Sequence, residues 1–247
     1  MDNKNLIGIS TGCFYYWSQQ KDLLSDQLGF ISIISKYVNR VELHFSLDNI
    51  YNISNKQIIA YKNVLGDMRR SIHLPSISEY FKKEDFASKI EYLFSELGIE
   101  YGVLHVDEYA KIKKLKLDFN PSYKIGLENS DIRKFSFQHL GDLGLFKSFP
   151  IILDIDHIEE MKSGSLNKEL KDLKNDILAI HFSSPQSKYF EKYKDIETTH
   201  YPYTRSGLTP PKSIPQGIPV IIEGVIPPNE IDLLKEEVTL IEKSYFS

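Results

Sequence analysis

The stretch Ile151-Ile-Leu-Asp154-Ile-Asp-His157 is an apolar run that ends in an aspartate, with a histidine three residues further along. Buried parallel strands read as continuous apolar runs, and in an α/β barrel the carboxyl ends of all strands meet at one face. Six other short runs end in the same way: Val41-Glu-Leu-His44, Arg70-Ser-Ile-His73, Gly102-Val-Leu-His105, Ile125-Gly-Leu-Glu128, Leu178-Ala-Ile-His181 and Val220-Ile-Ile-Glu223. We therefore expect seven strands that deliver a histidine or a carboxylate to one place.

Together with a strand-like segment near the amino end, these runs predict eight strands. The predicted ranges are 6–10, 40–45, 70–74, 102–106, 124–128, 150–154, 177–182 and 219–223. Successive ranges begin 22 to 42 residues apart, which leaves room for a helix after each strand, as βα units require. The whole chain has the usual length of one such barrel. We predict the α/β class and a single (β/α)8 barrel domain over residues 1–247.

Composition narrows the class of protein further. Hydrophobic residues make up 41% and charged residues 26% of the chain, which is typical of a globular protein. No apolar run approaches the ~20 residues that cross a bilayer, and no targeting segment is visible at the start, so we expect a cytoplasmic protein without a membrane partner. The single Cys13 fits a reducing compartment. A net charge of −4 gives no global reason to expect tight nucleic-acid binding.

The alternation of side chains along a strand predicts what lies below the polar groups. If the strand-end residues point into the barrel, the residues two positions earlier form the next layer: Ser71, Gly126, Ile152, Ala179 and Ile221. Any one strand-end histidine could be a hydrogen-bonded structural residue. A whole set of buried acids and imidazoles is costly without partners, however, and these groups are the ligands that divalent metals take. The set therefore predicts a metal site.

Several of these motifs resemble one known superfamily, the xylose-isomerase-like barrels. The matching runs are Ser-Ile-His73-Leu-Pro, Leu-His105-Val-Asp, Leu-Glu128-Asn, Leu-Asp154-Ile-Asp-His157, Ile-His181-Phe-Ser and Ile-Ile-Glu223-Gly. This superfamily includes sugar and sugar-phosphate isomerases and epimerases, inosose dehydratases and endonuclease IV enzymes. The resemblance covers nearly the whole chain, and it rests on the order and spacing of the motifs together.

The resemblance to the epimerases implies a ligand set and a mechanism. A single divalent ion (Mn, Co, Zn, Fe or Mg) would be held by Glu128, Asp154, His181 and Glu223. It further implies that the two glutamates are catalytic and move protons on opposite faces of a metal-bound enediolate. Glu42 and His44 lie in a motif that resembles the sugar isomerases, and Arg205 lies where epimerases often place a substrate-binding arginine.

Aromatic residues directly after the first strand are a further candidate for substrate binding. Trp17 closes the stretch Thr11-Gly-Cys13-Phe-Tyr-Tyr-Trp17, which would lie at the rim of the catalytic face. Such a cluster could form an apolar wall against a sugar ring, although such clusters often only pack loops.

The resemblance to endonuclease IV extends the set of metal ligands. Endonuclease IV enzymes hold three zinc ions, and His73, His105, His157 and His200 match further ligands in order, beside the four residues above. One matching position is Thr198, where a carboxylate would be required, and a neutral hydroxyl ligates divalent metals poorly. A second metal site is therefore expected more readily than a third.

The leading hypothesis is a metal-dependent isomerase or epimerase that acts on a sugar or sugar phosphate. The alternatives are an endonuclease IV-like metal-dependent phosphodiesterase or AP endonuclease, a polyol dehydratase, and a barrel that binds metal or ligand without catalysis. The expected partner is a small carbohydrate. Nucleic acid is disfavoured but stays open, as does assembly into a homo-oligomer.

Overall fold

The computed structural model describes residues 5–17, 23–76, 85–114, 122–129, 149–160, 177–185, 200–211 and 214–246. These residues contain eight parallel strands that pair in chain order and close into a barrel. The strands are β1 (Ile7–Ser10), β2 (Arg40–His44), β3 (Arg69–His73), β4 (Tyr101–His105), β5 (Ile125–Glu128), β6 (Ile151–Asp154), β7 (Ile177–Phe182) and β8 (Val220–Ile222). The predicted (β/α)8 barrel is confirmed.

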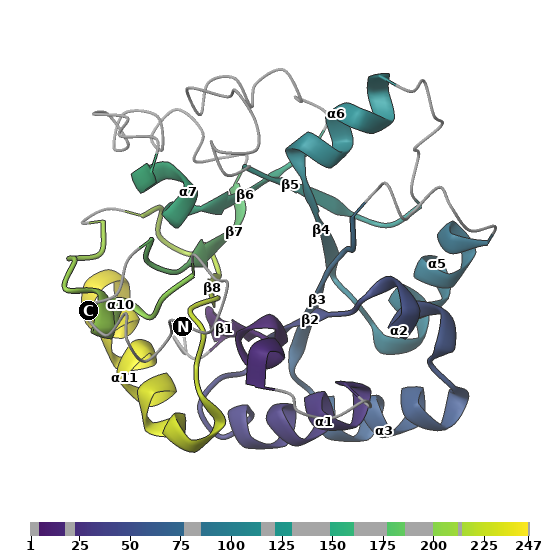
Figure 1. The fold of residues 1–247 in the computed structure, drawn as a ribbon, viewed down its shortest axis with the longest axis horizontal. Helices are drawn as coiled ribbons and strands as arrows, with labels where there is room; N and C mark the ends of the chain where they lie inside the picture. Colours follow the sequence, from purple (N-terminus) through teal and green to yellow (C-terminus); the bar gives the residue numbers. More distant parts are fainter. Residues whose placement is uncertain are drawn as a thin grey trace.

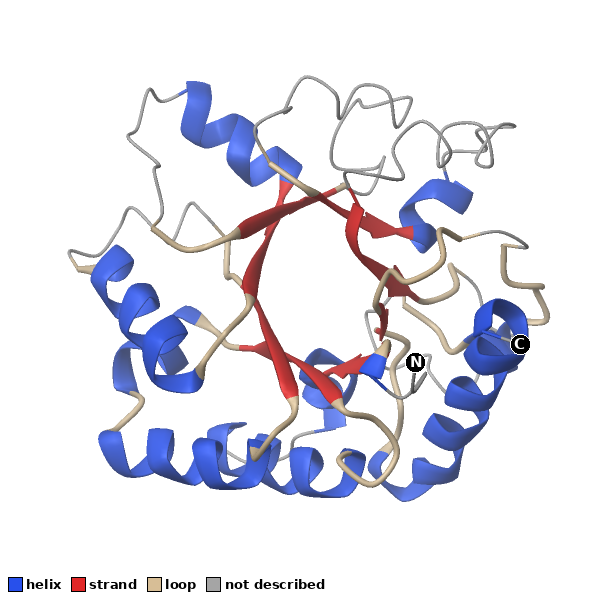
Figure 2. Ribbon diagram, turned by 180° about the vertical axis from the view of Figure 1, so that it is seen from behind, coloured by secondary structure: helices blue, strands red, loops and turns tan. Residues whose placement is uncertain are grey.

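Helices surround the ring of strands (Figures 1 and 2). The α-helices are α1 (Leu23–Ile34), α2 (Leu47–Asn52), α3 (Asn55–Leu65), α5 (Phe86–Leu97), α6 (Val106–Lys114), α7 (Ile155–Glu160), α10 (Tyr203–Ser206) and α11 (Ile231–Ile241). The remaining helical segments are the 3-10 helices η2 (Thr11–Trp17) and η4 (Pro228–Glu230) and the π-helix η5 (Glu242–Phe246). In α5 the apolar residues are buried at helical spacing, and Gly98 ends the helix in the left-handed region.

The pairing register of the strands brings the polar residues to one level. His44 pairs with His73 across β2 and β3, and His105 pairs with Glu128 across β4 and β5. Asp154 pairs with His181 across β6 and β7. Because the strands are parallel and in this register, their carboxyl ends present these side chains at the same mouth of the barrel.

An apolar layer lies inside the barrel below that level. It is formed by Tyr101, Val103, Ile152, Ala179 and Ile221, all buried. The predicted inner positions of Ile152, Ala179 and Ile221 are thereby confirmed. Gly126 is required in the same layer, because a Cβ atom there would lie 2.7 Å from the Cγ1 and Cδ1 atoms of Ile152.

This close approach predicts opposite effects for two glycine substitutions. Gly126→Ala should lower the free energy of unfolding by about 1–3 kcal/mol, because the added methyl group overpacks the barrel interior. Gly29→Ala in α1 should raise it by about 0.5–1 kcal/mol, because nothing lies within 4 Å of a Cβ atom there and alanine favours the helix. Urea unfolding of the two variants and the wild type measures both effects. Equal stability of Gly126→Ala and wild type would contradict the packing described here.

None of the described helices combines the length and apolar character that a membrane crossing requires.

Candidate metal centre

Four side chains meet at the carboxyl ends of the last four strands. Glu128 ends β5, Asp154 ends β6, His181 lies near the end of β7, and Glu223 follows β8 directly. Each offers one ligand atom, and these atoms all lie within 4.8 Å of one another. Asp154 and His181 are completely buried, and Glu128 is 2% exposed. The structure therefore brings together the four residues predicted as ligands of one divalent ion.

His181 directs one of its ring nitrogens toward two other members of this four-residue group. Its Nδ1 atom lies 3.3 Å from Glu128 Oε1 and 3.1 Å from Glu223 Oε2. Its Nε2 atom lies on the other side of the ring, 3.4 Å from Glu42 Oε1. Glu42 is 0% exposed, so it lies behind His181. Glu42 therefore contacts His181 on the side of the ring away from Glu128 and Glu223, and a substrate contact by Glu42 stays a prediction.

Asp154 divides its two carboxylate oxygens between the backbone and the site. Oδ1 accepts hydrogen bonds from the backbone N–H groups of Asp156, at 2.8 Å, and His157, at 3.3 Å. Oδ2 is buried and has no hydrogen-bond partner among the described residues. A buried oxygen without such a partner is costly, and coordination of a cation would satisfy it. This carboxylate therefore fits a metal ligand.

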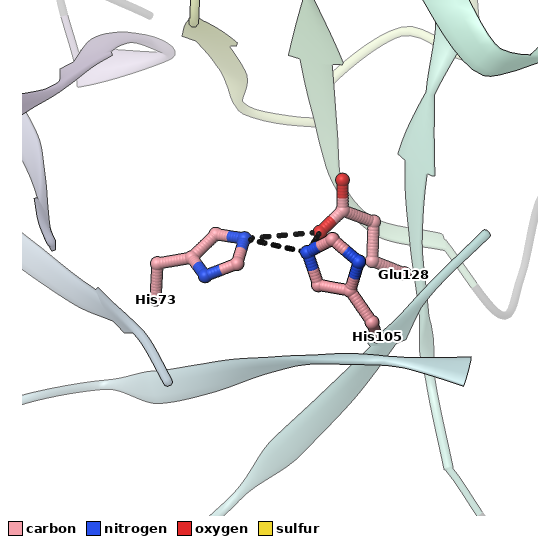
Figure 3. Close-up of side chains that lie close together, drawn as sticks. All are labelled: His73, His105 and Glu128. Atoms are coloured by element: carbon pink, nitrogen blue, oxygen red, sulfur yellow. Dashed lines mark hydrogen bonds and ion pairs between the residues drawn. The ribbon is translucent and has the colours of Figure 1, made fainter. Parts of the chain in front are cut away.

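A second group of potential ligands shares Glu128 (Figure 3). Glu128 Oε2 lies 3.2 Å from His73 Nε2 and 3.4 Å from His105 Nε2. The two Nε2 atoms lie 3.2 Å apart, so both imidazoles point toward one place. Because Oε1 of the same glutamate faces His181, Glu128 connects the four-residue group with the two histidines.

A third group consists of Asp154, His157 and His200. His157 Nδ1 lies 2.7 Å from the backbone oxygen of Asn129, which can accept its proton and leave Nε2 without one. His200 Nδ1 lies 2.9 Å from Ser183 Oγ. The sequence position that raises doubt about this site, Thr198, lies outside the described residues. The predicted histidines therefore lie together with Asp154, as the resemblance to endonuclease IV implies.

A buried carboxylate lies close to this third group. Asp156 is 0% exposed, and its Oδ2 atom lies 3.4 Å from His200 Nδ1. The same oxygen accepts a hydrogen bond from Ser183 Oγ at 3.4 Å. Sequence reasoning assigns no role to Asp156, Ser183 or Asn129. The available signal is their position, since each lies one or two residues after a strand-end candidate ligand.

The charges of the centre favour a bound cation. Burial raises the pKa of Asp154 to about 7; His157 opposes this rise and the nearby charge of Glu128 adds to it. Burial alone would lower the pKa of His73, but the contact with Glu128 outweighs it and raises the pKa to about 9. Crowded carboxylates thus hold protons on neighbouring groups. A divalent cation would neutralise the negative charge of these carboxylates as the protons do, and it would displace those protons.

A pocket of about 400 Å³ opens over the centre. Its described lining comes from six strand ends or the turns after them, and from His200: Ser10, Gly12, Cys13, His44, His73, His105, Glu128, His200, Glu223 and Val225. A second cavity of about 720 Å³ shares His44, His73 and His105 and extends along α6 to Asp107, Glu108 and Lys111. Cavities of this size hold small molecules.

The remaining predicted substrate contacts lie in three different surroundings. His44 lines the pocket and stacks on His73, with 5.1 Å between the ring centroids. Arg205 lies on α10, where its Nη1 atom binds Glu236 Oε2 of α11 at 2.6 Å. Trp17 ends η2, and its side chain is outside the described part of the structure. A substrate contact by His44, Arg205 or Trp17 stays a prediction.

Comparisons with known proteins place the fold. No family model matches the chain, and no curated protein matches it. Among solved structures, it is similar to endonuclease IV from Thermus thermophilus, with a TM-score of 0.61, 13% identity, and coverage of 96% of this chain and 99% of that one. It is also similar to a 3-keto-D-glucoside 4-epimerase from E. coli, with a TM-score of 0.58, 11% identity, and coverage of 96% and 99%.

A third similar structure is a sugar phosphate isomerase/epimerase from Parabacteroides distasonis, with a TM-score of 0.54, 13% identity, and coverage of 97% of this chain and 98% of that one. These similarities confirm the barrel fold. The fold and the site together define a (β/α)8 barrel with a candidate divalent-metal centre. At these identities the choice among activities depends on the site itself.

Proposed function

We propose that this protein is a divalent-metal-dependent isomerase or epimerase of a sugar or sugar phosphate. The observation that carries the proposal is the placement of Glu128 and Glu223. Both line the pocket, and both carboxylates contact His181 Nδ1, but they come from separate strands, β5 and the end of β8. Two carboxylates beside one ligand position are what removal and return of a carbon-bound proton requires.

Each residue of the centre has a defined part in this proposal. A divalent cation held by Glu128, Asp154, His181 and Glu223 would polarise the oxygens of a bound sugar and acidify the adjacent C–H bond. One glutamate takes the proton from that carbon, and the other returns a proton to the carbon skeleton. The pKa of Glu128 lies well below its ordinary value, because its histidine neighbours outweigh burial, so the carboxylate is ionised, as a metal ligand must be.

The pocket supports a small polar substrate. Its volume of about 400 Å³ lies at the lower end of the range for small-molecule sites. Histidines supply hydrogen-bonding groups for hydroxyls on the side of β2 to β4. The adjoining cavity carries Asp107 and Glu108, with Lys111 Nζ 2.5 Å from Glu108 Oε1. Lys111 Nζ also lies 3.8 Å from Asp107, so one negative charge remains in excess, which favours a neutral sugar over a sugar phosphate.

Solvent isotope exchange tests the proposal. Wild-type protein loaded with Mn²⁺ or Co²⁺ is incubated in D2O with a panel of ketoses and ketose phosphates, and NMR follows deuterium beside the carbonyl. We expect metal-dependent incorporation into at least one sugar, because the proton passes through a carboxylate that equilibrates with water. A dehydratase would form a product that lacks one water. Absence of exchange across the panel, with metal bound, would refute the proposal.

A second candidate, a metal-dependent phosphodiesterase, is favoured by the two additional groups of ligands. His73 and His105 share Glu128 with the four-residue group, and His157 and His200 share Asp154 with it. Neighbouring cations that share carboxylates are typical of enzymes that cleave phosphodiesters. Metal-dependent nicking of DNA that contains an abasic site, without exchange on any sugar, would support this candidate over the isomerase.

A further inference from the structure

Glu42 is a buried carboxylate for which the proposed proton transfer has no use. It lies on β2 inside the barrel, with 0% exposure, below the pocket. Its Oε2 atom accepts a hydrogen bond from Ser71 Oγ at 3.0 Å, and its Oε1 atom lies 3.4 Å from His181 Nε2. Arg40, two residues earlier on the strand, pairs with Glu100 instead. Among the described residues, His181 is the charged side chain that lies within ion-pair distance of Glu42.

The orientation of His181 makes this contact informative. Its Nδ1 atom faces Glu128 and Glu223, so this nitrogen is the one that can bind a cation. A histidine binds a metal through the nitrogen that carries no proton, and the proton then resides on the other nitrogen. That nitrogen is Nε2, which is buried and has no hydrogen-bond partner among the described residues; Glu42 Oε1, 3.4 Å away, is likewise buried and without one. Only a nearby acceptor can stabilise a buried N–H group in that position.

We infer that Glu42 is a positioning residue that holds the Nε2–H group of His181 and so presents Nδ1 to the cation. Ser71 fixes the Glu42 carboxylate from its other oxygen, which keeps the acceptor aimed at the ring. Partners of this kind set the tautomer and orientation of a ligating histidine and increase its basicity, and their loss typically weakens metal affinity about 10- to 100-fold. The inference rests on the cation that the proposed function requires, but it is independent of the substrate.

Two substitutions at Glu42 separate its charge from its hydrogen bond. Glu42→Gln keeps an oxygen that can accept from Nε2–H but removes the negative charge, whereas Glu42→Leu removes both. We expect the dissociation constant for Zn²⁺, measured by competition with a chromophoric chelator, to rise about 10- to 100-fold in the leucine variant and by less in the glutamine variant. Ser71→Ala should produce a smaller rise, because Glu42 stays in place but loses one anchor.

Glu237→Gln is the matched control. Glu237 is also 0% exposed, but it lies on α11 and accepts hydrogen bonds from the backbone of Tyr203 and Thr204. This variant should unfold more easily and yet bind Zn²⁺ like the wild type. If lower protein stability were enough to weaken Zn²⁺ binding, the Glu237→Gln variant would also bind Zn²⁺ more weakly.

The tautomer of the His181 ring is a second measurement, and it would not change if Glu42 only stabilised the fold. In Zn²⁺-loaded protein labelled with ¹⁵N-histidine, long-range ¹H–¹⁵N spectra should show the His181 proton on Nε2, and the Nε2 signal should shift in Glu42→Gln. Wild-type affinity in both Glu42 variants, or a proton on Nδ1 in the wild type, would overturn the inference. If the leucine variant fails to fold, the glutamine variant and the wild-type spectrum still decide.

Failure of the proposed function has a different signature. A protein that binds Zn²⁺ with the expected order of affinities, but exchanges no sugar proton, would leave the role of Glu42 intact and refute the isomerase. A wild type that binds no Zn²⁺ would overturn both.

Discussion

Replacing Asp154 with asparagine is expected to deprive the protein of its tightly held divalent cation. The substitution keeps an oxygen that can accept the backbone hydrogen bonds now made by Oδ1, but it removes the negative charge at Oδ2. The loss of affinity should exceed the 10- to 100-fold that removal of an outer partner costs, because a ligand itself is lost. The polypeptide should fold nevertheless, since its local backbone contacts can be kept.

Thermal unfolding with and without chelator measures this effect. A ligand that binds only the native state stabilises it by RT ln(1 + [L]/Kd), which is about 2.7 kcal/mol at a hundredfold excess over Kd. Chelator should therefore lower the melting temperature of the wild type and of the control Asp232→Asn, which lies on the exposed side of α11. It should leave Asp154→Asn nearly unchanged. An equal chelator effect in all three proteins would show that the cation does not depend on Asp154.

The second large effect concerns proton transfer. Glu223→Gln should abolish deuterium exchange on the sugar that the wild type uses, because an amide can neither accept nor return the proton. Positioned acids and bases contribute about 10²- to 10⁴-fold to rate, so exchange should fall by at least that factor. Glu128→Gln should have a similar effect. It should also disturb His73 and His105, since Glu128 Oε2 contacts both.

Metal content must be measured in each variant, because either substitution could remove the ion instead of the proton acceptor. Glu96→Gln on α5, where the carboxylate pairs with Lys62 at the surface, is the control and should exchange like the wild type. Undiminished exchange in a Glu223→Gln protein that retains its cation would contradict the role given to this residue.

Most of the fold can be predicted from the sequence, because each barrel strand has two recognisable sequence features. One is a short apolar run, and the other is a polar residue at the carboxyl end of that run. The sequence predicts a strand over residues 40–45, where Arg40–His44 form one, and a strand over residues 177–182, where Ile177–Phe182 form one. The inner layer at Ile152, Ala179 and Ile221 follows from alternation alone.

The contacts of several site residues cannot be predicted in the same way. Glu42 and His44 belong to one motif, yet one is buried behind His181 and the other lines the pocket. Alternation separates two faces of a strand, but it does not say which neighbour across the barrel a side chain meets. Arg205 pairs with Glu236 because α10 packs beside α11, and that arrangement depends on contacts between distant segments. Asp156 carries no signal of burial in its local sequence.

The proposed centre requires that Glu128, Asp154, His181 and Glu223 hold a divalent cation. Anomalous diffraction from a crystal of the wild-type protein, grown with Mn²⁺ or Zn²⁺, tests it most directly, because it locates the ion among named ligands. We predict a strong peak enclosed by these four side chains, with any further peaks beside His73 and His105 or beside His157 and His200. A crystal that contains the metal but shows no peak between Asp154 and His181 would contradict the account.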